Sequence, residues 1–330
     1  MEILDAVRLN LLSPAVLFFA LGVLAAVVKS DLKFPEPLYL GLTIYLLVAI
    51  GFKGGVALAE AGLGRVWLPS LAAVALGAVI PLWTYPVLRH LGRLPGVDAA
   101  AIAAHYGSVS AVTFIAATNY LSAVGQTYPN YATAFLAIME SPAILIGVVL
   151  GKLGAPRGET GAVGSTLRGV VHEALFGRSV LLLLGSLVVG FLCGPAGLEK
   201  VGPFFVTPFQ GVLALFLLEM GTVAGRRWQD LRRVGPFLLG FGVIVPLVNG
   251  ALGVVAGQLC GLEVGGATLL GVLAASASYI AAPAAIRVSL PEANPTLYLT
   301  ASLAVTFPFN ITLGIPACYA FAQWLFLPAS

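Results

Sequence analysis

Long stretches without charged side chains dominate the sequence and constrain its fold more than any other feature. Only 9% of the 330 residues are charged, 59% are hydrophobic, and the mean hydropathy is +0.99. A soluble domain carries about a quarter charged residues, so this chain cannot cover itself with a polar surface. The apolar runs are continuous and lack the period-2 alternation of barrel strands. The sequence therefore predicts an all-α polytopic membrane protein.

About ten of these stretches are long enough to cross a bilayer, which takes roughly 20 apolar residues per helix. The expected spans, numbered 1 to 10 in chain order, are residues 12–28, 38–60, 66–88, 98–122, 130–151, 178–194, 208–225, 235–261, 264–287 and 295–327. The polar segment 152–177 is expected to be a cytoplasmic connecting loop, with a surface helix from Ser165. It separates a first repeat at 1–151 from a second at 178–330.

The positions of the basic residues predict the orientation of the chain. The loops after spans 1, 3, 5, 7 and 9 hold Lys29, Lys33, Arg89, Arg93, Lys152, Arg157, Arg168, Arg178, Arg226, Arg227, Arg232, Arg233 and Arg287. The opposite side holds only Arg8, Arg65 and Lys200. Because basic loops stay in the cytoplasm, we expect a multi-pass protein of the bacterial cytoplasmic membrane with both termini extracytoplasmic. The net charge of +3 is small and scattered, which argues against a nucleic-acid partner.

The two halves of the chain resemble each other. Pro129 and Pro142 of span 5 coincide with Pro295 and Pro308 of span 10 when the halves are laid over one another. The serine patches of spans 4 and 9, and the breaks in spans 2 and 7, follow in the same order. Five spans is an odd number, so the second copy would enter the membrane upside down. This pattern predicts two inverted repeats of five spans, as in many secondary transporters.

Spans 4 and 9 each carry a patch of small and hydroxylated residues near the middle. Two helices broken there would cross at mid-membrane. Their N-terminal backbone N–H groups and hydroxyls would then point at a shared anion. Their C-terminal carbonyls and the hydroxyls near Ser110 and Ser278 would suit a sodium ion. The alternative is close helix packing, which small residues permit. The predicted substrate-binding residues are Gly107, Ser108, Ser110, Ser276, Ser278 and Tyr279.

Few ionisable residues interrupt the apolar runs. Lys53, Glu140 and Glu219 do so, and together with Thr113 they are the candidates for ion coupling. Such residues cost about 3 kcal/mol at mid-helix and usually mark a site or an ion pair. A Lys53–Glu219 ion pair between spans 2 and 7 is one interpretation, and a role beside the transported ions is the other. His105 is expected to be a hydrogen-bonded core histidine.

Four motifs carry a resemblance to a known family. They are Gly107-Ser108-Val109-Ser110, Met139-Glu140-Ser141-Pro142-Ala143, the run from Ala274 to Ile280 with Pro283 and Arg287, and Leu290-Pro291-Glu292-Ala293-Asn294-Pro295. In this order they resemble the sodium-dependent bicarbonate transporter family, best known from cyanobacteria. Tyr279 stands where the cyanobacterial proteins have Asp, and Glu140 replaces an Asp.

The resemblance implies a homotrimer in which spans 3–5 and 8–10 form a core and spans 1, 2, 6 and 7 form a gate. It implies sodium-coupled uptake of bicarbonate, with the anion at the crossing of spans 4 and 9 and sodium nearby as co-substrate, and with no other cofactor. It also implies a PII-like cytoplasmic regulator.

Two other functions fit the sequence. One is a carrier of another small carboxylate or anion, coupled to sodium or protons through Glu140 or Glu219. The other is a membrane sensor or scaffold that transports nothing. An enzyme or an ATP-driven pump is disfavoured, because no nucleophile–base pair, metal-ligand cluster or phosphate-binding loop stands out. The three cysteines, Cys193, Cys260 and Cys318, are expected to be packing residues.

Overall fold

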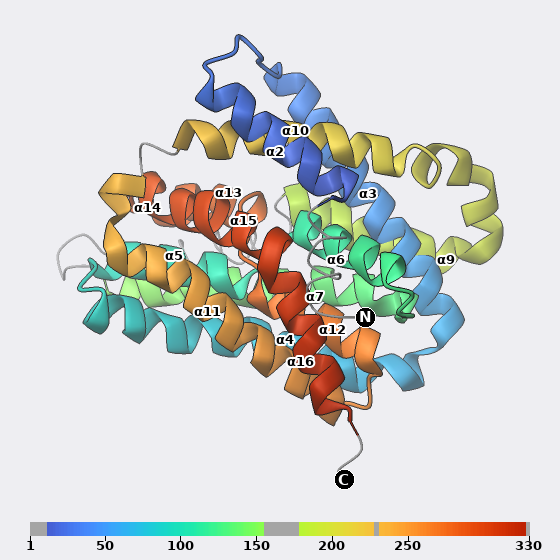
Figure 1. The fold of residues 1–330 in the computed structure, drawn as a ribbon. Helices are drawn as coiled ribbons and strands as arrows, with labels where there is room; N and C mark the ends of the chain where they lie inside the picture. The colour runs from blue at the N-terminus through green and yellow to red at the C-terminus, as the bar shows by residue number, and fades with distance from the viewer. Residues whose placement is uncertain (1–11, 155–177, 228–230, 328–330) are drawn as a thin grey trace.

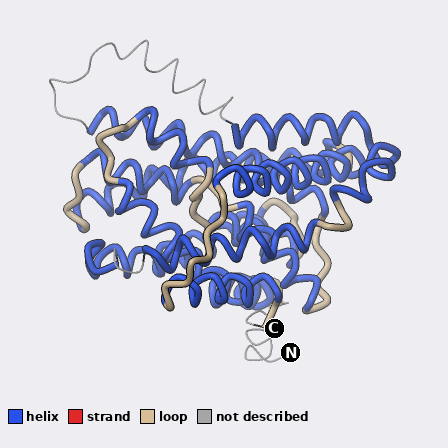
Figure 2. Tube along the Cα trace, turned by 90° about the horizontal axis from the view of Figure 1, so that it is seen from above, coloured by secondary structure: helices blue, strands red, loops and turns tan. Residues whose placement is uncertain are grey.

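The computed structural model describes residues 12–154, 178–227 and 231–327, and every regular segment in these ranges is helical (Figure 1, Figure 2). The helices are α2 (Pro14–Val27), α3 (Glu36–Ala61), α4 (Leu63–Pro86), η1 (Val87–Leu91), α5 (Gly96–Gly107), α6 (Ala111–Ala123), η2 (Asn130–Ala132), α7 (Thr133–Gly154), α9 (Arg178–Phe205), α10 (Phe209–Arg226), α11 (Leu231–Leu259), α12 (Val264–Ala275), α13 (Ala281–Ser289), α14 (Pro295–Leu299), η4 (Thr300–Thr306), α15 (Phe307–Phe309), η5 (Asn310–Gly314) and α16 (Ile315–Leu325). The all-α prediction is confirmed. The surface helix predicted from Ser165 lies outside the described residues.

Seven helical segments of the described chain are long and apolar enough to cross a membrane. They are 36–61, 64–91, 96–123, 130–154, 181–205, 235–259 and 295–325. The other three predicted spans correspond to shorter elements: α2 for span 1, α10 for span 7, and α12 with α13 for span 9. The number ten therefore stays a prediction.

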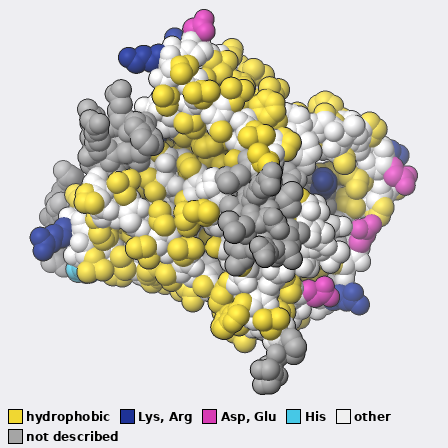
Figure 3. Space-filling model, in the orientation of Figure 1, with side chains coloured by type: hydrophobic (Ala, Val, Ile, Leu, Met, Phe, Trp, Pro, Cys, Tyr) yellow, Lys and Arg dark blue, Asp and Glu magenta, His cyan; other side chains and the backbone are white. Residues whose placement is uncertain are grey.

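The outer surface has the character expected next to lipid. Hydrophobic side chains are spread widely over the face shown in Figure 3, and most charged side chains visible there lie near its edges. Large apolar residues are exposed along helices, among them Leu192 of α9 at 76% and Trp67 of α4 at 62%. Exposing such a surface to water would cost free energy, whereas contact with the hydrocarbon of a bilayer would not.

The helices pack in close pairs. α2 lies along α10 and α3 lies along α9, while α5 and α4 pack on α7, and α11 packs on α12 (Figure 1). Glycines permit the closest approach: a Cβ on Gly55 of α3 would meet the Leu187 carbonyl of α9, and one on Gly190 of α9 would meet the Phe52 carbonyl of α3. Small residues are the usual device for packing helices inside membranes.

Changing Gly190 to alanine is expected to destabilise the protein by about 2 kcal/mol, because the new methyl group collides with backbone that cannot rotate away. Thermal unfolding of the purified protein in detergent measures this. The matched control is Gly185→Ala on the same helix, where a Cβ meets nothing within 4 Å. Equal melting temperatures for the two variants would contradict the α3–α9 contact.

Two short helices end at serines in the same backbone conformation. α5 and α12 are both 12 residues long. Ser108 follows α5 with φ −80° and ψ 168°, and Ser276 follows α12 with φ −81° and ψ 165°. The chain is extended at both serines and becomes helical again at Ala111 and Ala281. Spans 4 and 9 are thus interrupted at the predicted serine patches.

Two other spans differ from their predicted form. α9 continues beyond the predicted end of span 6 to Phe205, through a kink at Gly194, whose φ of 59° suits glycine. Span 10 is helical over its length but contains π-helical turns at η4 and η5. Pro308 and Pro316 lie in or just after these turns and lack the N–H that a regular α-helix would use.

Candidate functional site

The two interrupted spans touch at their non-helical segments, Ser108–Ser110 and Ser276–Ile280, which we call the serine crossing. The Ser278 N–H donates a hydrogen bond of 2.8 Å to the His105 carbonyl. The Ser110 N–H donates one of 2.9 Å to the Ser276 hydroxyl, which in turn donates to the Leu273 carbonyl at 2.7 Å. Backbone groups that an unbroken helix would pair internally are therefore satisfied across the crossing.

The Ser110 hydroxyl is the centre of a buried network. It accepts hydrogen bonds from the Thr113 N–H at 3.1 Å and from the Thr113 hydroxyl at 2.9 Å, so it caps the N-terminus of α6. It donates to the Tyr279 hydroxyl oxygen at 3.1 Å. The Tyr279 ring packs edge-on against Phe307, with centroids 5.2 Å apart. Tyr279 is thereby fixed over the crossing.

A small cavity of about 10 Å³ lies at the crossing. Its polar lining residues are Ser110, Glu140, Ser278 and Tyr279. Glu140 comes from α7, is 5% exposed, and its Oε2 has no hydrogen-bond partner. The volume is about that of one water molecule. The cavity thus offers one carboxylate and several hydroxyl oxygens to an occupant the size of a water or a bare monovalent cation.

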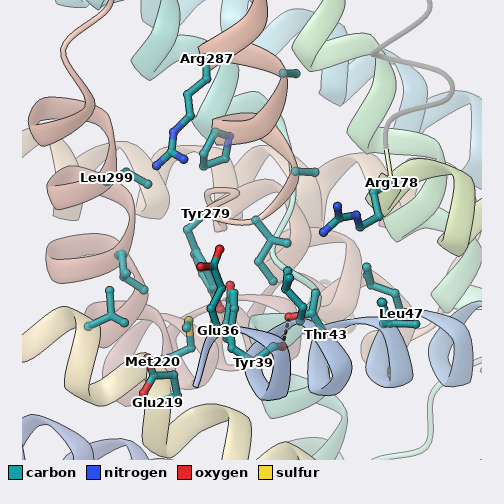
Figure 4. Close-up of a pocket in the computed structure, with 18 of the residues that line it drawn as sticks. Glu36, Tyr39, Thr43, Leu47, Arg178, Glu219, Met220, Tyr279, Arg287 and Leu299 are labelled. Atoms are coloured by element: carbon teal, nitrogen blue, oxygen red, sulfur yellow. Dashed lines mark hydrogen bonds between the residues drawn. The ribbon is translucent and has the colours of Figure 1, made fainter. Parts of the chain in front are cut away.

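A large cavity of about 600 Å³ reaches the crossing from one side (Figure 4). Arg178 of α9 and Arg287 of α13 extend toward it from opposite walls, and Glu36 and Glu219 supply negative charge. Tyr279 lines both this cavity and the small one. The side chain of Tyr279 therefore lies between the wide, charged space and the serines.

One wall of the large cavity was not anticipated from the sequence. Glu36, Tyr39, Thr43 and Leu47 line it from one face of α3, and the Thr43 hydroxyl donates to the Tyr39 carbonyl at 2.9 Å (Figure 4). Their spacing of three to four residues is the signal that could have revealed them, since it places polar groups on one side of an apolar helix. In the sequence analysis Arg178 was only a marker of orientation, and Arg287 was a marker of orientation and of the family resemblance.

The structure gathers only some of the residues predicted for the site. Ser110, Ser278, Tyr279 and Glu140 line the small cavity. Thr113 contacts Ser110 as described above.

The other three residues predicted to bind substrate, Gly107, Ser108 and Ser276, do not line the small cavity. Ser276 serves the hydrogen bonds of the crossing, and the buried Ser108 hydroxyl has no partner. Gly107 packs against the Pro81 ring, where a Cβ would collide. Gly107 is thus a packing position.

Two of the ion-coupling candidates lie away from the crossing. Glu219 lines the large cavity, and one of its carboxylate oxygens accepts from the Thr222 hydroxyl at 2.9 Å. Lys53 lines a third cavity, and its Nζ is 5.5 Å from the centroid of the Phe209 ring. The two side chains form no ion pair with each other, so that interpretation is wrong.

His105 is a core residue, as expected. Its Nδ1 is 2.7 Å from the Ala101 carbonyl and its ring stacks on Tyr298 with centroids 4.5 Å apart. Its Nε2 has no partner. Within the ranges that the structure describes, no three His, Cys, Asp or Glu side chains gather as metal ligands.

A family model for the Na⁺-dependent bicarbonate transporter superfamily matches residues 14–323. The chain belongs to this superfamily. A comparison with curated proteins found no match. The superfamily match runs from the first residue of α2 into α16, so it includes the serine crossing and all three cavities. Membership of the Na⁺-dependent bicarbonate transporter superfamily implies a membrane transporter rather than an enzyme.

Four helix ends meet at the serine crossing. α6 and α13 begin there, and a helix N-terminus carries partial positive charge. α5 and α12 end there, and their last carbonyls carry partial negative charge. Partial charges of both signs therefore meet within one buried region.

Proposed function

We propose that the protein is a secondary transporter that takes up bicarbonate together with sodium. The observation that carries this proposal is the serine crossing, where four helix ends meet beside the buried Glu140 carboxylate, whose Oε2 has no hydrogen-bond partner in the described part of the chain. Family membership supplies the class of transporter. The crossing supplies a chemical reason for the two substrates, because it combines groups that attract an anion with groups that attract a cation.

In this proposal the anion binds to the N-terminal side of the crossing. The N–H groups at the start of α6 and α13 face it, together with the unpartnered Ser108 hydroxyl and that of Ser278. The hydroxyls of Ser110 and Ser276 complete the site by turning from Tyr279 and the Leu273 carbonyl, to which they now donate. Tyr279 stands beside Ser110 and provides a phenolic hydroxyl as a further hydrogen-bonding group. No full positive charge is needed in the site, because backbone dipoles and hydroxyls stabilise a small anion in a medium of low polarity.

Sodium binds in the small cavity. Hydroxyl and carboxylate oxygens are hard ligands of the kind that sodium accepts, and the cavity holds three hydroxyl groups and the Glu140 carboxylate. Among the described residues, no basic side chain forms an ion pair with Glu140. A bound sodium would supply the compensating positive charge, which gives a reason for a costly carboxylate inside the membrane. Sodium and bicarbonate would then stabilise each other's binding.

The repeat and domain organisation belong to the same proposal. The equal lengths of α5 and α12 and the matching conformations of Ser108 and Ser276 support two inverted repeats of five spans. The pairing of α2 with α10 and of α3 with α9 supports a gate that is distinct from the core. The homotrimer and the PII-like regulator stay predictions of the resemblance.

The two larger cavities support alternating access. Along α3, residues 36–47 line the large cavity, and Ile50 to Glu60 line the third one. The crossing is between them. The large cavity is bordered by Arg178 and Arg287, which the charge distribution assigns to the cytoplasmic side. The conformation described here is therefore open inward in this proposal.

Uptake of labelled bicarbonate into proteoliposomes tests the function. We expect uptake that requires an inward sodium gradient and disappears when potassium replaces sodium. Uptake that ignores sodium, or transport of a small carboxylate such as acetate without transport of bicarbonate, would contradict the proposal. A response to a proton gradient alone would favour the alternative of proton coupling.

A further inference from the structure

A third cavity lies at the end of α3 opposite the large cavity. It measures about 340 Å³ and is bounded by α3, α6, α9, α10, η2 and the start of α7. The segment ends that surround it, near Glu60, Tyr128 and Phe209, belong to loops that the charge distribution places outside the cytoplasm. We call it the Lys53 cavity. It is on the side from which a substrate for uptake arrives.

Lys53 is the basic residue among those that line this cavity. Its ammonium group is held over the Phe209 ring at 5.5 Å, a distance that allows a cation–π contact. No described carboxylate forms an ion pair with it. A lysine in the middle of an apolar helix is costly, and such residues usually mark a site or a pathway. Because an ion pair does not explain Lys53, a ligand with negative charge is the better explanation.

The remaining polar lining of the cavity consists mainly of neutral hydrogen-bonding groups. They are Thr118, Asn119, Ser122, Tyr128, Asn130, Thr133 and Gln210. Amides and hydroxyls of this kind orient a polar ligand without competing for its charge. Glu60 is the acidic lining residue, and it lies two helical turns from Lys53, about 10 Å along the axis. The positive end of the cavity is therefore at Lys53 and the negative end at Glu60.

Two of these neutral groups also hydrogen-bond to each other across the cavity lining. The side-chain amides of Asn119 and Gln210 exchange hydrogen bonds of 3.1 and 2.9 Å between α6 and α10. α6 begins at the serine crossing, whereas α10 packs on α2. The amide pair thus joins a helix of the proposed core to a helix of the proposed gate. A ligand at Lys53 is next to the contact that would have to open for it to reach the crossing.

We propose that the Lys53 cavity is a second anion site, which captures a small oxyanion from outside before the anion reaches the serine crossing. Lys53 attracts the charge, and the amides and hydroxyls hydrogen-bond to the oxygen atoms. A cavity with charge of one sign and walls of low polarity raises the local concentration of counter-ions. The identification of the oxyanion as bicarbonate rests on the proposed function, whereas the existence of the site does not.

The experiment measures the electrostatic potential and the occupancy of the cavity without using transport. Ser122→Cys is introduced into the full chain with Cys193→Ala and Cys260→Ala, because Ser122 is exposed and lines the cavity. Intact cells are treated with a membrane-impermeant methanethiosulfonate carrying a negative sulfonate or a positive trimethylammonium group. We expect the anionic reagent to be favoured, and Lys53→Gln to lower the ratio of the two rates by about tenfold. Lys53→Arg should keep the ratio.

Occupancy is then measured by protection of the same cysteine. Bicarbonate should slow labelling in the presence of Lys53 but not after Lys53→Gln, whereas chloride at equal ionic strength should slow it less. The matched control is Arg65→Gln, which removes a basic residue of the same side outside the cavity lining.

Three results would overturn the second anion site: a rate ratio that Lys53→Gln leaves unchanged, no protection by bicarbonate, or no labelling from outside. Protection without sodium-dependent uptake would instead keep the site and refute the proposed function.

Discussion

Replacing Glu140 by glutamine is expected to abolish the sodium dependence of uptake and to lower sodium-driven bicarbonate uptake by about 10- to 100-fold. Glutamine has the same shape but no charge, so it cannot neutralise a sodium ion in the small cavity. The fold should be kept, because a neutral amide is cheaper to bury than an unpaired carboxylate. Sodium-dependent uptake by proteoliposomes measures the loss.

A second measurement separates sodium binding from transport. Sodium should raise the melting temperature of the unaltered protein, since a ligand that binds only the folded state stabilises it. This stabilisation should vanish in Glu140→Gln. The matched control is Glu219→Gln, which removes a carboxylate of the large cavity that already accepts a hydrogen bond from Thr222. If Glu219→Gln removes the sodium response and Glu140→Gln keeps it, sodium does not bind in the small cavity.

Replacing Ser110 by alanine is expected to destabilise the protein by about 1–2 kcal/mol and to weaken the apparent affinity for bicarbonate by about tenfold. The change removes the cap of α6 and leaves the Thr113 N–H and the Tyr279 hydroxyl without their present partner. The Thr113 N–H is buried, so losing its partner carries a desolvation cost. Thermal unfolding and the substrate dependence of uptake give the two quantities.

Another N-cap serine provides the control for this variant. Ser13 caps α2 by accepting from the Val16 N–H at 3.4 Å, away from the crossing. Ser13→Ala should lower the melting temperature slightly and leave the affinity for bicarbonate unchanged. If Ser110→Ala also leaves that affinity unchanged, Ser110 caps a helix but binds no substrate.

Much of the architecture could be predicted because it depends on local properties of the chain. A bilayer demands long runs of apolar residues, so α3, α4, α7 and α11 are visible in the sequence. The breaks at Ser108–Ser110 and Ser276–Ile280 were also predictable. Small hydroxylated residues and Pro283 weaken a helix at those positions.

The ion pair predicted between Lys53 and Glu219, which the structure does not contain, shows where reasoning from the sequence alone fails. The two residues occupy corresponding places in the two halves, which suggested contact. If the halves are inverted, corresponding positions are related by an axis in the membrane plane. Residues away from that axis then lie on opposite sides of the membrane. The structure agrees with this separation, because the two side chains line cavities at opposite ends of α3.

The sequence by itself determined that the chain is a bundle of apolar helices and where two of them break, while the sidedness inferred from its basic residues stays a prediction. These features follow from the preferences of single segments for lipid, water or an irregular backbone. Only the tertiary structure decided that Glu140 of α7 lines a cavity with serines of two other spans and that Ser110 donates a hydrogen bond to Tyr279. It also decided that Lys53 lines a separate cavity. Those contacts join segments far apart in the chain, and the way the helices pack sets them.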